Sequence, residues 1–273
     1  MSYLKLENVC FEYSDGFRAV ENVNLSINKG ERVAILGQNG AGKTTTVKLM
    51  NGLLKPTHGR VIVNGKDTKD FTTAQISRMV GYVFQNPDEQ IFNQDVYSEI
   101  IYTPKYCKFP KEDIRRRLRK ALNLTGIEEY LDENPYNLPY SLRKFVTIAA
   151  VIAMEPDIII LDEPTAGQDV RGMNQIAHII NEMEKEGRTV ITITHDMEFV
   201  VKNFDRVIVM ANKNVIADDD KREIFWRTDI LERSSLHQPQ VSKLCNELGV
   251  NEKILDINEC VNYMKNLNGG KNE

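Results

Sequence analysis

A glycine-rich segment between an apolar run and a helix-forming run carries the clearest chemistry of the sequence. The pattern G-x-x-x-x-G-K-[ST] is matched without a mismatch by Gly37-Gln38-Asn39-Gly40-Ala41-Gly42-Lys43-Thr44. Glycines let a backbone wrap closely around phosphates with its N–H groups pointing inward, and a following helix adds the positive end of its dipole. Lys43 is expected to reach the β- and γ-phosphates of a nucleotide, and the Thr44 hydroxyl to bind Mg²⁺. A glycine-rich turn without a ligand is the alternative, which the sequence context disfavours.

Two adjacent carboxylates supply what a phosphate site needs for hydrolysis. Asp162 and Glu163 directly follow the apolar run 158–161. If this run is a buried strand, Asp162 lies at its carboxyl end beside the phosphate loop, where it can hold a metal-bound water. Glu163 is then placed to polarise the attacking water. Alone, an apolar run that ends in two acids is a common strand end, but together with the phosphate loop it indicates a hydrolytic site.

The elements that must position these residues alternate between apolar strands and helices. A buried parallel sheet with helices on both faces is predicted by apolar runs at 32–36, 79–84, 158–161, 189–193 and 206–210. Residues 3–36 are β-rich, and the run 60–63 with the following Asn64-Gly65 predicts a hairpin edge. The segment 95–153 is helical in pattern, and short helices follow residue 218. The sequence therefore predicts an α/β protein.

Composition excludes several classes of protein. The 273 residues include 35 Lys+Arg and 39 Asp+Glu, a net charge of −4, which gives no overall attraction to nucleic acid. We expect no secretory signal, and no run reaches the roughly 20 apolar residues that span a membrane. The four cysteines are far apart in sequence, so reduced thiols in the cytosol are expected. The basic run 115–120 is interpreted as a solvated face, or one turned toward an acidic partner, rather than a nucleic-acid site.

From Tyr3 to about residue 217, the order of these motifs resembles that of the ATP-binding-cassette (ABC) ATPases. The resemblance implies a P-loop NTPase core of the ABC ATPase type, with an N-terminal antiparallel β-subdomain, a helical subdomain and a short C-terminal helical extension. It places an ABC ATPase domain at 1–217, with the helical subdomain inserted at about 86–155. The extension at 218–273 is the expected dimerisation region. ATP and Mg²⁺ are the implied cofactors.

The resemblance also assigns roles to individual side chains. Gln85 matches the family's glutamine loop, and His195 matches the switch histidine that contacts the γ-phosphate. Tyr13 stands where the family stacks an aromatic ring on adenine, although a strand tyrosine packed in the core is the alternative. Asp169 matches the carboxylate of the loop that crosses the dimer interface. The implied nucleotide contacts are Tyr13, Gly37, Gln38, Asn39, Gly40, Ala41, Gly42, Lys43, Thr44, Thr45 and Asp162. The implied catalytic residues are Glu163, His195 and Gln85, and the implied Mg²⁺ ligands are Thr44, Gln85 and Asp162.

Three segments narrow the resemblance to the energy-coupling-factor and cobalt-importer ATPases. They are residues 85–92, 162–167 and 236–241. This group powers the uptake of vitamins or of cobalt and nickel ions. The implied partners are a second ATPase subunit, a transmembrane coupling subunit and a substrate-binding membrane subunit, with no nucleic acid. The implied location is the cytoplasmic face of the cell membrane, as a peripheral protein.

The signature motif of the family, usually Leu-Ser-Gly-Gly-Gln, is altered in this chain. The same register holds Leu138-Pro139-Tyr140-Ser141-Leu142. In a nucleotide-sandwich dimer this segment caps the ATP bound by the other subunit. Pro139 lacks a backbone donor and Tyr140 is bulky where close approach is needed, although the Ser141 hydroxyl is a possible substitute.

Two milder departures lie elsewhere. Gln168 replaces the usual leucine of the interface loop, and Tyr102-Thr103-Pro104 stands where these importers commonly carry Phe-Gly-Pro, on the face toward the membrane partner. The hypothesis is an asymmetric dimer, in which this chain's own site hydrolyses ATP with a signature supplied by a second ATPase. The alternatives are a regulatory subunit that scarcely hydrolyses ATP and a soluble ABC ATPase.

Overall fold

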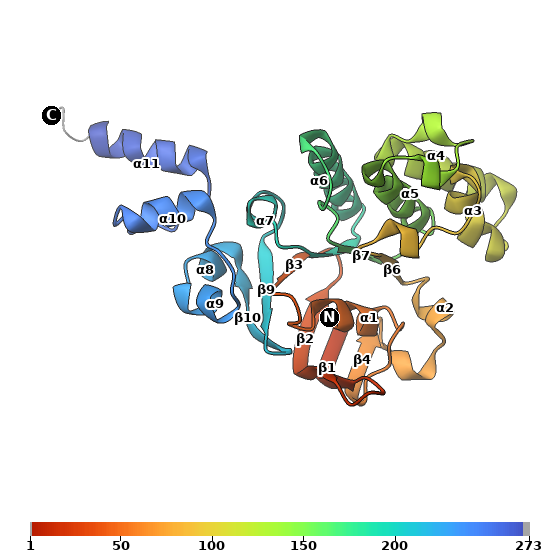
Figure 1. Ribbon diagram of the computed structural model, residues 1–273, viewed down its shortest axis with the longest axis horizontal. Coiled ribbons are helices and arrows are strands. Elements are labelled where there is room, and N and C mark those ends of the chain that lie inside the picture. The colour runs from red at the N-terminus through yellow and green to blue at the C-terminus, as the bar shows by residue number, and fades with distance from the viewer. Residues whose placement is uncertain (1, 270–273) are drawn as a thin grey trace.

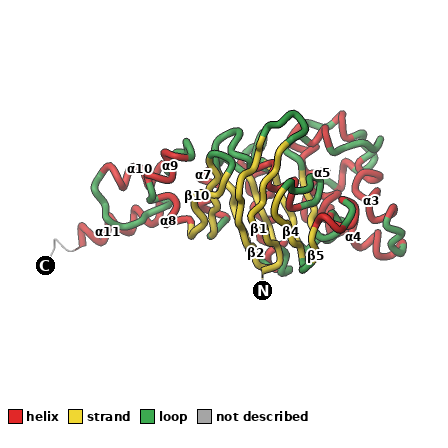
Figure 2. Tube along the Cα trace, turned by 90° about the horizontal axis from the view of Figure 1, so that it is seen from below, coloured by secondary structure: helices red, strands yellow, loops and turns green. Residues whose placement is uncertain are grey.

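The N-terminal part of the chain forms an antiparallel sheet. The computed structural model describes residues 2–269. Its four-stranded sheet has the order β2-β1-β4-β5 and consists of β1 (Ser2–Glu12), β2 (Arg18–Asn28), β4 (His58–Val63) and β5 (Lys66–Asp67). Figure 2 shows these strands side by side, and side chains alternate between buried and exposed along β1 and β2. The expected hairpin edge after residue 63 is the β4–β5 pair.

A second, six-stranded sheet forms the centre of the molecule. Its order is β10 (Asn214–Asp220), β9 (Arg206–Ala211), β3 (Arg32–Leu36), β8 (Thr189–Ile193), β7 (Ile158–Asp162) and β6 (Val80–Val83). The five strands from β9 to β6 are parallel, and β10 pairs with β9 in the antiparallel sense. Parallel strands present their carboxyl ends at one edge, so the segments that follow β3, β6, β7 and β8 meet there.

The two faces of the central sheet are covered differently. Ile159 and Leu161 belong to a core shared with the helices, including α5 (Tyr140–Ile152), α6 (Val170–Lys185) and α7 (Met197–Asn203). Ile158 and Ile160 belong to a second core, shared with the antiparallel sheet and α1 (Lys43–Met50). The expectation of helices on both faces is therefore incomplete. A buried strand is apolar on both faces whether a helix or a sheet covers it, so the apolar runs alone do not distinguish the two.

The middle of the chain is helical, as predicted. It contains α3 (Val96–Tyr106), α4 (Lys111–Thr125) and α5, together with the short turns η2 (Pro87–Glu89), η3 (Glu128–Tyr130) and η4 (Pro135–Asn137). In Figure 1 these helices lie beside the β6–β7 edge of the central sheet. Along the chain, η1 (Thr68–Asp70) and α2 (Thr73–Ile76) connect β5 of the antiparallel sheet to β6 of the central sheet.

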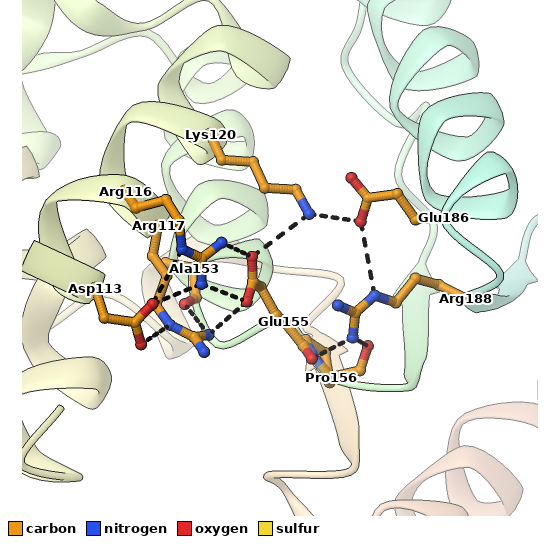
Figure 3. A network of polar contacts seen from close by, with 9 residues as sticks. All are labelled: Asp113, Arg116, Arg117, Lys120, Ala153, Glu155, Pro156, Glu186 and Arg188. Atoms are coloured by element: carbon orange, nitrogen blue, oxygen red, sulfur yellow. Dashed lines mark hydrogen bonds and ion pairs between the residues drawn. The ribbon is translucent and has the colours of Figure 1, made fainter.

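Much of the basic run on α4 is neutralised within the chain. Glu155, between α5 and β7, lies 2.7 Å from Arg116, 3.1 Å from Arg117 and 3.6 Å from Lys120. Lys120 also lies 2.5 Å from Glu186, directly after α6. Figure 3 shows these contacts converging from α4 on the two loops that precede β7 and β8. For Arg116, Arg117 and Lys120, the acidic partner considered in the sequence analysis is therefore a glutamate of the same chain.

The C-terminal part consists of short helices that extend away from the sheets (Figure 1). They are α8 (Lys221–Phe225), α9 (Thr228–Arg233), α10 (Gln240–Glu247) and α11 (Ile257–Gly269). Trp226 packs against both the main core and a small core that contains Cys245 and Cys260, and its indole N–H donates to the Ile254 carbonyl at 3.2 Å. Within residues 2–269, no helix is both long and apolar enough to cross a membrane.

Candidate functional site

The phosphate loop joins β3 to α1 and depends on two glycines. A Cβ atom on Gly37 would lie 2.1 Å from the Met210 carbonyl oxygen, and one on Gly42 would lie 2.7 Å from the Ala19 carbonyl oxygen. Both glycines also have left-handed φ angles, 147° and 97°, so a side chain is excluded by contact and by conformation. A cavity of about 170 Å³ lies over the loop; its lining includes Phe17, Asn39, Lys43, Thr44 and Thr45.

The Lys43 ammonium is folded back onto the loop. Its Nζ donates to the Gly37 carbonyl at 2.6 Å and to the Gln38 carbonyl at 3.0 Å. Burial lowers the pKa of this ammonium, and the Glu163 and Asp162 carboxylates partly offset that effect. The two carbonyls hold Lys43 within the cavity, beside the place where the loop would receive phosphates.

Asp162 lies at the carboxyl end of β7 and is almost completely buried. Its Oδ2 accepts a hydrogen bond from the Tyr82 hydroxyl at 2.7 Å and from the Thr44 hydroxyl at 3.2 Å, whereas its Oδ1 has no partner among residues 2–269. Burial raises the pKa of the Asp162 carboxyl against the effect of these donors. A buried carboxylate oxygen without a partner next to a hydroxyl oxygen is a donor set that suits Mg²⁺, which prefers oxygen ligands.

Glu163 and His195 are brought together from adjacent strands. Glu163 follows β7 and His195 follows β8, and Nδ1 of His195 lies 2.9 Å from Oε2 of Glu163. The Glu163 side chain is mostly buried, whereas 76% of the His195 side chain is exposed. Glu163 has a left-handed backbone, φ 48°, and its N–H donates to the Ile193 carbonyl at 2.8 Å. The carboxylate that sequence analysis assigns to water activation therefore lies next to the assigned histidine.

Gln85 follows β6, and its backbone is held by helix α5. The Gln85 carbonyl accepts hydrogen bonds from Nζ of Lys144 at 2.5 Å and from the Tyr140 hydroxyl at 3.1 Å. Lys144 is completely buried, and burial lowers its pKa to about 8. Sequence analysis missed both Lys144 and Tyr82. The signal available for Tyr82 was a hydroxyl on a strand whose other residues, Val80, Gly81 and Val83, carry no polar side chain.

Residues 138–142, which sequence analysis aligns with the family signature, lie at the N-terminus of α5. Pro139 precedes the helix, and no side chain caps it. The Tyr140 ring packs over Gly167, where an added Cβ would lie 3.1 Å from it. The side-chain amide of Gln168 donates to the Ser141 carbonyl at 3.1 Å. Tyr140 and Gln168, which sequence analysis interprets as departures from the family pattern, thus join residues 138–142 to the loop that contains Gly167.

Tyr13 and Asp169, to which the family resemblance also assigns roles, contact residues close to them in sequence or at the phosphate loop. The Tyr13 hydroxyl lies 3.2 Å from the Thr45 hydroxyl, and its ring stacks on that of Phe17 with centroids 6.5 Å apart. Phe17 lines the cavity over the phosphate loop and was not singled out from the sequence. Asp169 caps α6 by accepting from the Gly172 N–H at 2.7 Å.

Comparison with known proteins identifies the family. A family model described as ABC transporter matches residues 20–166. The energy-coupling factor transporter ATP-binding protein EcfA3 of Clostridium perfringens is 39% identical over 245 residues, which cover 88% of this chain and 86% of that protein. The chain belongs to the ABC transporter ATP-binding proteins. As an ABC ATPase, it binds ATP and couples ATP hydrolysis to transport as a subunit of a membrane transporter complex.

Solved structures agree with this family. CbiO1 from Clostridium perfringens, described as part of the ABC transporter complex cbiONQ, has a TM-score of 0.76 and 38% identity, covering 90% of this chain and 99% of that chain. A dimeric ATP-binding cassette in a post-hydrolysis state, bound to ADP and Pi, has a TM-score of 0.73 and 27% identity, covering 80% of this chain and 98% of that chain. The predicted fold class, an ABC ATPase core with an antiparallel sheet and helical regions, is confirmed.

Proposed function

We propose that this protein is the ATP-hydrolysing subunit of an energy-coupling-factor importer that takes up a micronutrient, either a vitamin or a cobalt or nickel ion. Its similarity to EcfA3 and to CbiO1 supports the importer type. The proposed partners are a second ATPase subunit, a transmembrane coupling subunit and a substrate-binding membrane subunit. The proposed location is the cytoplasmic face of the membrane.

One observation carries the proposed chemistry: Thr44, Asp162, Glu163 and His195 meet at the carboxyl edge of the parallel sheet, beside the phosphate loop. Lys43 neutralises charge on the β- and γ-phosphates, and Glu163 accepts a proton from the attacking water. His195, whose Nδ1 lies 2.9 Å from Oε2 of Glu163, would contact the γ-phosphate. Thr44, Asp162 and Gln85 would hold Mg²⁺, which supplies charge neutralisation on the phosphate oxygens when bound. Tyr13 is the proposed adenine contact, with Phe17 beside it.

The dimer is proposed to be asymmetric, with one productive site. The nucleotide held by this chain would be capped by the signature of a second ATPase. The opposite nucleotide would be capped by residues 138–142 of this chain, where Pro139 offers no N–H group and Tyr140 is already packed on Gly167. Loss of one donor to the developing phosphate charge typically lowers the rate by about 10²–10³. The opposite site is therefore expected to be almost silent.

Two surfaces are proposed to contact partners. The membrane subunit would dock at a groove of about 240 Å³ whose lining includes Phe84, Phe92 and Tyr102. Phe92 and Tyr102 are exposed and stack edge to face, with centroids 4.7 Å apart. The second ATPase would also contact residues 218–273, where Leu244 of α10 and Leu248 directly after α10 are exposed.

Steady-state ATPase activity of the purified chain, alone and with candidate partner ATPases, tests the proposal. We expect little turnover alone, stimulation by the partner, and loss of that stimulation in Glu163→Gln of this chain. High turnover of the chain alone would contradict the asymmetric dimer. The alternative function, which the altered signature supports, is a regulatory subunit that scarcely hydrolyses ATP. A single-turnover assay separates the two, because a regulatory subunit would leave its bound ATP intact when the partner is present.

A further inference from the structure

Lys144 is a buried cation to which the proposed mechanism gives no role. It has no exposed surface and is one of the largest side chains that are completely buried. A buried ammonium is unfavourable unless hydrogen bonds and opposite charges compensate for its lost hydration. A methionine or leucine at this position of α5 would avoid that penalty. The contacts of Lys144 should therefore explain why a lysine stands here.

Both hydrogen bonds of Lys144 reach backbone carbonyls at the candidate site. Nζ donates to the Gln85 carbonyl at 2.5 Å and to the Glu163 carbonyl at 3.2 Å. Gln85 follows β6 and Glu163 follows β7, and these two strands are paired neighbours in the central sheet. A single ammonium thus joins the two segments that leave the sheet with the glutamine and the glutamate assigned to hydrolysis.

The backbone of Glu163 needs such support. Its φ of 48° lies in the left-handed region, which is unfavourable for a residue with a side chain and persists only where surrounding contacts enforce it. The Ile193 carbonyl accepts from its N–H at 2.8 Å, and Lys144 donates to its carbonyl. The peptide groups on both sides of the Glu163 side chain are therefore fixed, one by β8 and the other by α5.

The charge of Lys144 also suits this place. The carboxylates of Asp162 and Glu163 both interact favourably with its ammonium. Lys43 is the other cation near these acids, but it belongs to the phosphate loop and is assigned to the nucleotide. Lys144 has no path to a phosphate, since it is enclosed and donates to backbone on two sides.

We propose that Lys144 is a positioning residue for ATP hydrolysis, which holds the backbones of Gln85 and Glu163 in the relative arrangement that directs their side chains at the γ-phosphate. The inference rests on the proposed roles of Gln85 and Glu163. It assigns to α5 a function within this chain's own site, separate from the capping of the opposite nucleotide.

The test compares Lys144→Met with Lys55→Met in the transporter complex purified through a tag on this chain. Lys55 is a matched control, because its ammonium also donates to two backbone carbonyls, those of Thr68 and Phe71, away from the candidate site. Lys144→Met should lower kcat at least tenfold and change KM for ATP less than twofold. It should also lower Tm, because the buried Glu163 carbonyl loses its donor and the two carboxylates lose a cation. Lys55→Met should lower Tm and leave kcat unchanged.

Two further measurements keep the outcomes distinct. Hydrogen–deuterium exchange on the purified chain needs no turnover; in Lys144→Met, residues 84–90 should exchange faster while 37–45 remain unchanged. Lys144→Gln retains an N–H donor and should recover part of kcat. If Lys144→Met does not fold, the kcat and the hydrogen exchange of Lys144→Gln are judged by the same criteria. A kcat within twofold of wild type, or unchanged exchange at 84–90, overturns the inference. Wild-type turnover in Glu163→Gln would instead overturn the proposed catalytic role of Glu163.

Discussion

Replacing Tyr82 with phenylalanine should separate the positioning of Asp162 from general stability. The substitution removes only the hydroxyl that donates to Oδ2 of Asp162 at 2.7 Å. The carboxylate then retains the Thr44 hydroxyl at 3.2 Å, while its Oδ1 already lacks a partner within the described part of the chain. The perturbation therefore removes the shorter of the two hydrogen bonds that this buried group accepts.

The expected magnitude follows from burial and charge. A hydrogen bond to a charged, buried acceptor contributes about 1.5–3 kcal/mol, and a loss of about 2 kcal/mol lowers Tm by roughly 4–8 °C in a protein of this size. Removing the group that orients a metal-ligating carboxylate typically weakens metal binding by about 10–100-fold. Tyr82→Phe should therefore raise, by at least about tenfold, the Mg²⁺ concentration needed for tight nucleotide binding.

A matched control lies at the other end of β7, the strand that ends in Asp162. The Tyr3 hydroxyl donates to Asp157 at 2.7 Å, just before β7, and Asp157 keeps Lys29 at 3.1 Å when that hydroxyl is lost. Tyr3→Phe should lower Tm by less than Tyr82→Phe, because the Asp157 side chain is 36% exposed. Its Mg²⁺ dependence should equal that of wild type.

The assay is a Mg²⁺ titration of the binding of a fluorescent ATP analogue, with Tm from differential scanning calorimetry of the same samples. The reasoning is refuted if Tyr82→Phe shows the wild-type Mg²⁺ dependence. It is also refuted if Tyr3→Phe shifts that dependence as much as Tyr82→Phe does.

Two other predictions concern the phosphate loop and the C-terminal helices. Gly37→Ala should abolish ATP binding in the same fluorescence assay, because its Cβ would lie 2.1 Å from the Met210 carbonyl at a φ of 147°, and wild-type binding would contradict the proposed loop. The ion pair with Arg222 lowers the pKa of Glu259 from 4.5 to about 2. The ion pair therefore stabilises the folded state fully above pH 4.5, by about 1 kcal/mol after screening by solvent. This contribution is lost as the pH falls toward 2. The difference in unfolding free energy between wild type and Arg222→Gln, followed through the single tryptophan, Trp226, should shrink over that range, and a constant difference would contradict it.

Those parts of the fold that depend on local pattern could be predicted from the sequence. The run Arg32–Leu36 is a strand at the expected bounds, because a fully buried parallel strand is apolar throughout. The phosphate loop could be predicted because its motif contains Gly37 and Gly42, which contacts with nearby backbone require to be glycines. The proximity of Asp162 to Thr44 follows from the topology, since parallel strands end at a common edge.

Contacts between distant segments could not be predicted in this way. Lys144 belongs to an amphipathic helix, where a lysine normally faces solvent, and its burial depends on the adjacency of β6 and β7 beneath α5. The basic run on α4 has the same explanation, because Glu155 becomes its partner only when the loop before β7 packs against α4. Long side chains carry their charge several ångströms from the backbone, so their sequence position does not determine their partners.

In the proposed asymmetric dimer, helix α5 would contribute to both nucleotide sites. Its N-terminus, at Pro139 and Tyr140, would face the nucleotide of the other subunit, whereas Lys144 lies about one turn further along and contacts the segments of this chain's own site. The Tyr140 hydroxyl adds a second hydrogen bond to the Gln85 carbonyl, which a glycine at this position would not provide. In the proposed dimer, Tyr140 would weaken the cap of the opposite site, whereas in this chain its hydroxyl contacts the backbone of Gln85. The proposed asymmetric dimer is the arrangement in which this exchange would leave one site with all of its assigned residues.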